Sequence, residues 1–148
     1  MYIHEVMSFK DKTETFSIEP EAPVADAVRQ LVELDIGSLV VIHGDTLVGF
    51  ITERDILRGL QLRGCNVEGV KVSDLMEQEP VIASSDDSVD YARDVLTKSR
   101  TSHLIVMDAD KVTGVLSFHD VAKACLKEAK FEASLLKRYI KHWPEGAG

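Results

Sequence analysis

The stretch "GFITERD" (residues 49–55) recurs later in the chain as "GVLSFHD" (residues 114–120). In both copies a glycine is followed at three-residue steps by a hydroxyl residue and then an aspartate. Serine or threonine at a helix N-cap with an acid at N3 is the capping-box pattern, so each stretch predicts the start of a helix. The doubled motif therefore either caps two helices or forms part of a ligand site.

The recurrence belongs to a longer internal repeat. Residues 24–59 align with residues 89–124 at a constant offset of 65, without a gap. Eight pairs are identical: Val24/Val89, Ala27/Ala92, Leu31/Leu96, Leu39/Leu104, Val41/Val106, Asp45/Asp110, Gly49/Gly114 and Asp55/Asp120. Most of these positions are apolar or lie in turns, which is what two copies of one fold require.

Each copy predicts the order β-α-β-β-α. A short strand is expected at residues 14–18 and again at 80–83, each followed by an amphipathic helix. The apolar runs "SLVVI" (38–42) and "HLIVM" (103–107) predict buried strands, and "HGD" (43–45) and "DAD" (108–110) predict hairpin turns. The helix after each motif is expected to face inward with Ile56, Leu57 and Leu60 in the first copy, and with Val121, Cys125 and Leu126 in the second. Because about 60 residues bury little core alone, we expect two repeats packed about a pseudo-twofold axis, an α/β (α+β) fold.

The repeats define the predicted organisation of the chain. Residues 1–62 form the first repeat, 63–71 a linker, 72–126 the second repeat, and 127–148 a C-terminal amphipathic helix and tail. The segments "YIHEVM" and "KVSDLM" are helical lead-ins to the two repeats. The tail carries an apolar stripe at helical spacing: Phe131, Leu135, Leu136, Tyr139, Ile140 and Trp143, before Pro144 and Gly146. The stripe either packs on its own domain or contacts a second copy in a dimer.

Composition narrows the class of protein. The chain has 148 residues, 45% of them apolar and 28% charged, which suits one globular unit. No apolar run is long enough to span a bilayer and no signal-peptide pattern begins the chain, so we expect a cytoplasmic protein without membrane contact. The formal charge of −8 opposes nucleic-acid binding. Catalytic motifs and clusters with metal-ligand spacing are not found in the sequence, so no enzyme and no metal site are predicted.

The doubled motif also has the chemistry of a nucleotide site. Free N–H groups at a helix N-terminus and a hydroxyl suit a phosphate, while a carboxylate can accept from both hydroxyls of a sugar diol. Aspartate reaches back to an N-cap less well than glutamate, and the preceding glycine leaves space, so both features favour binding over capping alone. Arg54 and His119 occupy matching positions and either contact the ligand or face solvent. His103, which matches Ser38, is either a core histidine or a ligand contact.

The repeat with its two motifs resembles a tandem pair of CBS (cystathionine β-synthase) domains, over about residues 1 to 126. The resemblance implies two clefts that take adenosine ligands such as AMP, ADP, ATP, NAD(H) or S-adenosylmethionine. It implies that Asp55 and Asp120 hold ribose hydroxyls and that Thr52 and Ser117 hold phosphate or ribose. It places the adenine near Thr15, Phe16 and Ser17 in the Asp120 cleft, and near Pro80, Val81 and Ile82 in the Asp55 cleft. The phosphate region would be lined by Gly37, Ser38, Ser102 and His103.

Two functions remain open at this point. In the first, the chain is a non-catalytic sensor that binds an adenine nucleotide, forms a homodimer, and signals to an unknown protein partner in trans. In the second, the clefts are degenerate, the aspartates only cap helices, and the chain is a structural or dimerisation module. Neither requires a catalytic cofactor.

Overall fold

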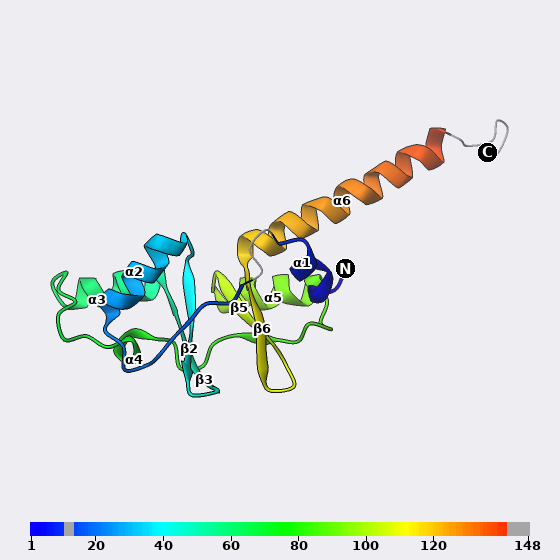
Figure 1. Cartoon of the computed structure of the whole chain (residues 1–148). Helices are drawn as coiled ribbons and strands as arrows, with labels where there is room; N and C mark the ends of the chain where they lie inside the picture. The colour runs from blue at the N-terminus through cyan, green and yellow to red at the C-terminus, as the bar shows by residue number, and fades with distance from the viewer. Residues whose placement is uncertain (11–13, 142–148) are drawn as a thin grey trace.

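The computed structural model describes residues 1–10 and 14–141. These residues form two halves with the same fold (Figure 1). The first half contains α1 (Ile3–Ser8), β1 (Ser17–Ile18), α2 (Val24–Leu34), β2 (Ser38–His43), β3 (Thr46–Thr52) and α3 (Glu53–Leu62). The second contains α4 (Val72–Leu75), β4 (Ile82–Ala83), α5 (Val89–Ser99), β5 (His103–Asp108), β6 (Lys111–Ser117) and α6 (Phe118–Lys141). This order confirms the predicted α/β fold with its repeated unit and helical lead-ins.

Each half builds one three-stranded sheet, in the orders β1-β2-β3 and β4-β5-β6. The outer strand is parallel to the central strand, and the hairpin that follows is antiparallel. Both hairpins shift register at the same place, after Val41 and after Val106. The strands β1 and β4 pair over only two residues each, so they are shorter than the predicted 14–18 and 80–83. The bulge and the short outer strand therefore repeat, as the sequence does.

The sheets are buried on both faces. The face of each sheet that meets the helices carries one core, with Leu39 and Ile51 in the first half and Leu104 and Leu116 in the second. The opposite faces meet each other through a third cluster centred on Val40, Phe50 and Ile105. This contact holds the two halves together and explains why the runs at 38–42 and 103–107 are continuously apolar.

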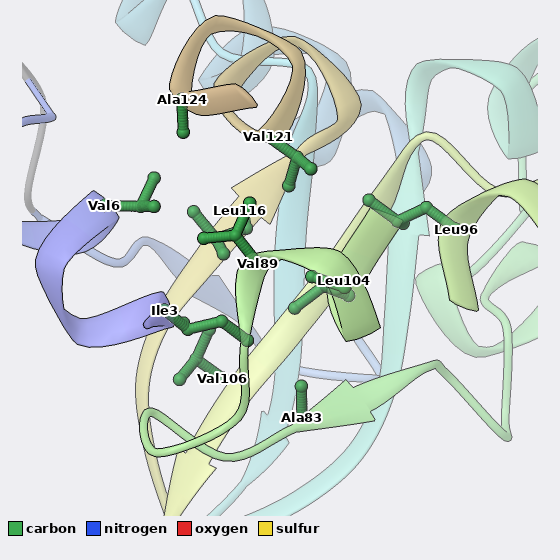
Figure 2. Packing of buried hydrophobic residues seen from close by; sticks show 11 residues of the cluster. Ile3, Val6, Ala83, Val89, Leu96, Leu104, Val106, Leu116, Val121 and Ala124 are labelled. Atoms are coloured by element: carbon green, nitrogen blue, oxygen red, sulfur yellow. The ribbon is translucent and has the colours of Figure 1, made fainter. Parts of the chain in front are cut away.

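The lead-in helices cross between the halves. The apolar side chains of α1, Ile3 and Val6, belong to the core of the second half, as Figure 2 shows. In the same way Val72 of α4 belongs to the core of the first half. Backbone hydrogen bonds fix both crossings: the Val89 N–H donates to Met1 over 2.9 Å, and the Val24 N–H donates to Val70 over 2.8 Å. Each half is thus completed by a segment that precedes the other.

The long helix α6 leaves the body of the protein (Figure 1). Its first turns bury Val121 and Ala124, but the apolar side chains further along it are 47–65% exposed: Phe131, Leu135, Leu136, Tyr139 and Ile140. The alternative in which this stripe packs on its own domain is therefore wrong, because the helix extends beyond the core. Trp143, Pro144 and Gly146 lie outside the described residues. The prediction of inward-facing residues is confirmed for Ile56 and Val121, which are buried, and wrong for Leu57 and Leu126, which are 65% and 57% exposed.

Candidate functional site

Both motifs lie where a strand runs directly into a helix. In the first half the Asp55 N–H donates to the Thr52 hydroxyl over 3.2 Å, and the Thr52 N–H donates to Asp55 Oδ2 over 3.0 Å. In the second half the Asp120 N–H donates to the Ser117 hydroxyl over 3.0 Å, and the Ser117 N–H donates to Asp120 Oδ2 over 2.9 Å. Aspartate therefore does close both capping boxes, and its shorter side chain is no argument for binding. A carboxylate has more lone pairs than these caps use, so capping and binding are compatible.

The sequence suggested that the glycine of each motif leaves space for a ligand. The structure contradicts this expectation. A Cβ on Gly49 would lie 2.5 Å from Met76 Sδ and 2.9 Å from the Glu77 carbonyl oxygen. A Cβ on Gly114 would lie 1.9 Å from Met7 Cε. Each glycine instead receives a methionine of the crossing lead-in, and this contact docks the lead-in beside the motif.

A cleft of about 670 Å³ opens between the halves at Asp120. Its volume is within the range of sites for small organic ligands. Eight residues singled out from the sequence line it: Thr15, Phe16, Gly37, Ser38, His103, Ser117, His119 and Asp120. Ser17 was expected here and is not among the lining residues. The two halves thus bring residues more than 80 positions apart to one cavity.

A smaller cleft of about 430 Å³ lies beside the first motif. It is lined by five of the singled-out residues: Gly37, Thr52, Arg54, Ser102 and His103. Asp55, Pro80, Val81 and Ile82 do not line it. Asp55 is half-buried in its capping box, and Ile82 is 45% exposed. The pseudo-twofold therefore relates the two motifs, whereas the cavities next to them differ in size and in lining.

His103 lines both clefts. Its ring is half-buried, lies edge-on to Phe50 with 6.1 Å between centroids, and has Nδ1 2.9 Å from the Ser102 hydroxyl oxygen. Burial lowers the pKa of His103, and Lys10 lowers it further, against the opposing effect of Asp120. The imidazole is therefore neutral at physiological pH and can either donate to or accept from a ligand.

Lys10 is the site residue that the sequence did not reveal. Its Nζ lies 3.1 Å from Asp120 Oδ2 and donates to the Val115 carbonyl oxygen, and its side chain is only 20% exposed. Burial raises the pKa of Asp120, but the Ser117 N–H and the Lys10 ammonium outweigh burial, so the pKa is lowered. Asp120 is thus ionised at neutral pH. Lys10 follows α1 in the first repeat, and the crossing of α1 brings it to the motif of the second repeat.

The described residues contain neither a cluster suited to a metal ion nor a helix that could cross a membrane. In residues 1–10 and 14–141 there is no group of three or more His, Cys, Asp or Glu that could hold a metal ion. Over the same residues no helix combines the length and the apolar character needed to cross a membrane. The cytoplasmic location stays a prediction.

The chain is similar in sequence and in structure to known proteins. A family model described as the CBS domain matches the chain twice, over residues 5–62 and 72–127. The CBS domain-containing protein CBSX3, mitochondrial, from Arabidopsis thaliana is 31% identical over 146 residues, which are 93% of this chain and 71% of the relative. A solved protein with CBS domains from Burkholderia ambifaria matches with a TM-score of 0.81 and 26% identity, over 86% of this chain and 95% of that chain. The structure of CBSX2 in complex with AMP matches with a TM-score of 0.72 and 25% identity, over 85% and 97% of the two chains.

Proposed function

The chain belongs to the CBS-domain family, and from this premise we propose that it is a non-catalytic regulatory module that binds an adenosine-containing nucleotide at Asp120. The observation that carries the proposal is an ionised, largely enclosed carboxylate in a cleft of about 670 Å³ that both halves line. Such a carboxylate accepts from two adjacent ribose hydroxyls. The similar structure of CBSX2, solved with AMP, supports an adenosine ligand.

Each part of the ligand has a place in this proposal. The ribose diol binds Asp120, and the adenine lies against Thr15 and Phe16 at the entry to β1. The phosphate is held near Ser117 and the start of α6, where the positive end of the helix dipole suits an anion. We assign a secondary role or none to the Asp55 cleft, because Asp55 does not line the cavity beside it.

We also propose that the module is a homodimer and passes its signal to a protein partner in trans. Apolar side chains at the surface of the module support the homodimer, among them Val32 (74% exposed), Leu57 and Leu62 (84% exposed) on α2 and α3. The stripe on α6 adds Leu135 and Tyr139, which continue the face that buries Val121. A ligand alters such an assembly only if it binds one arrangement more tightly than another.

Isothermal titration of AMP, ADP, ATP, NADH and S-adenosylmethionine tests the binding proposal. Asp120→Asn keeps the shape of the side chain and removes its charge, so it should abolish binding of the preferred nucleotide. Asp55→Asn is the matched control, because it alters an equivalent capping box without altering the lining of the larger cleft. Equal loss in both variants, or no heat with any of the five compounds at millimolar concentration, would refute the proposal.

The alternative of a structural module with degenerate clefts makes a different prediction. If the two aspartates only cap helices, each Asp→Asn change lowers stability by about 1 kcal/mol or less and alters no response to ligand. Thermal unfolding of both variants with and without nucleotide separates the alternatives. A nucleotide that raises the Tm of the wild type and of Asp55→Asn, but not of Asp120→Asn, excludes the structural alternative.

A further inference from the structure

The lining of the Asp120 cleft contains three lysines, Lys10, Lys123 and Lys127. Lys127 has its Nζ 4.0 Å from the centroid of the Phe9 ring. Lys10 differs from the other two because its ammonium is bound inside the cleft, between Asp120 Oδ2 and the Val115 carbonyl oxygen. Within residues 1–10 and 14–141, Lys10 is the lysine that forms an ion pair with Asp120, the carboxylate assigned to the ribose.

The position of Lys10 follows from the crossing of the lead-in. Ile3 and Val6 anchor α1 in the core of the second half, and Met7 packs against Gly114. Three residues after Met7 the chain reaches Lys10. The anchoring of α1 thus delivers a positive charge to the second motif.

The lead-in of the second repeat carries the opposite charge at the equivalent position of the sequence. Met76 packs against Gly49 as Met7 packs against Gly114, and three residues after Met76 the chain reaches Glu79. Among the described residues Asp55 forms no ion pair of the kind that Lys10 forms with Asp120. Glu79 is exposed and lines neither cleft, so this lead-in adds no cation to the smaller cleft as Lys10 does to the larger one.

We propose that Lys10 sets the ligand class of the Asp120 cleft and makes it selective for an adenosine ligand that carries a phosphate. The proposal rests on the proposed function, namely an adenosine ligand whose ribose binds Asp120. A phosphate placed close to an ionised carboxylate in a half-buried cleft is repelled, and a neighbouring ammonium offsets that repulsion. When ribose hydroxyls donate to Asp120, the flexible lysine stem lets the ammonium turn from the carboxylate toward the phosphate. A neutral nucleoside gains nothing from that turn, and a sulfonium ligand is repelled.

A rival role for Lys10 makes the opposite prediction. The ammonium already occupies Asp120 Oδ2 and the Val115 carbonyl oxygen, two acceptors that a ligand could use. If Lys10 only plugged the cleft, its removal would tighten the binding of every adenosine ligand. If Lys10 selects phosphate, its removal weakens the binding of the phosphorylated ligand and of no other.

The test compares AMP with adenosine, which differs from it only by the phosphate, and adds S-adenosylmethionine as the cationic arm. Lys10→Met keeps an apolar stem and removes the charge, and Lys10→Arg keeps the charge. Lys111→Met is the matched control, since Lys111 is exposed at the start of β6, lines neither cleft and undergoes the same change in charge. Full-length protein is used throughout, and its Tm is measured for each variant.

Lys10→Met should lower the affinity for AMP about ten-fold or more, because it removes one charge-assisted hydrogen bond. The affinity for adenosine should change by less than about three-fold. Lys10→Arg and Lys111→Met should keep the preference for AMP over adenosine. An equal loss of affinity for AMP and adenosine would mean that Lys10 has only a structural role. Tighter binding of both would mean that Lys10 only blocks the cleft. Either result overturns the proposal. If the wild type binds neither compound, the proposed function itself fails. If it binds both equally through Asp120, only the selectivity fails.

Discussion

Replacing the glycine of each motif by alanine should have unequal effects in the two halves. At Gly49 the new Cβ would lie 2.5 Å from Met76 Sδ and 2.9 Å from the Glu77 carbonyl oxygen. The sulfur belongs to a flexible side chain, but the carbonyl is backbone and accepts from the Phe50 N–H over 2.9 Å. Relief of the clash therefore requires the bridge between Phe50 and Glu77 to move.

At Gly114 the contact is shorter but easier to relieve. The new Cβ would lie 1.9 Å from Met7 Cε, which is the far end of a side chain with three rotatable bonds. Neither glycine has a positive φ, so alanine fits both backbones and stabilises by about 0.4–1 kcal/mol through the unfolded chain. We expect Gly49→Ala to lower the free energy of unfolding by about 1–3 kcal/mol, the usual cost of overpacking. We expect Gly114→Ala to change it by about 1 kcal/mol or less, because the two effects nearly cancel.

Urea unfolding followed by circular dichroism measures the difference. For a chain of this size about 1 kcal/mol corresponds to a change of roughly 2–4 °C in Tm, so a thermal scan gives an independent value. Met76→Ala in the Gly49→Ala background should recover only part of the loss, because the Glu77 carbonyl still obstructs the Cβ. A loss at Gly114 equal to or larger than the loss at Gly49 would refute the reasoning from backbone and side-chain contacts.

Three further predictions concern pH and assembly. The pKa of Asp120 is lowered in the folded protein. Its contribution to stability is therefore present above the usual pKa of 3.8 and is lost as the pH falls through the pKa of the folded state. In Asp120→Asn the stability should fall less steeply with decreasing pH in the acid range. The pKa of His103 is lowered by burial, so the unfolded chain takes up the proton first and stability falls as the pH drops below 6.5. His103→Gln should remove that part of the pH dependence. A midpoint above 6.5 in an NMR titration of His103 would contradict the lowered pKa. Leu135→Glu should shift sedimentation from dimer toward monomer, whereas Glu132→Gln, which alters an exposed polar residue of the same helix, should not.

Much of the fold follows from local patterns in the sequence. The repeat at an offset of 65, the apolar runs of β2 and β5 and the capping motifs that open α3 and α6 are properties of neighbouring residues, and the structure has them where the patterns place them. The motif also indicates the candidate site, since Thr52, Ser117 and Asp120 lie at or next to helix starts and line the two clefts. Strand length was predicted less well, because pairing of β1 and β4 depends on the partner strand rather than on their own residues.

What only the tertiary structure decided is where the lead-ins go and what they bring. No local pattern indicates that α1 packs on the second half or that Met7 packs against Gly114. Nor does any local pattern indicate that Lys10 pairs with Asp120, 110 residues away. The same holds for the unequal clefts and for the stripe on α6, since a helix pattern shows an apolar face and not whether a core reaches it. Sequence by itself determined the repeated unit and the acid at each helix start, because those arise from residues close in the chain. The charge around that acid depends on contacts between distant segments, and these exist only once the two halves have packed together.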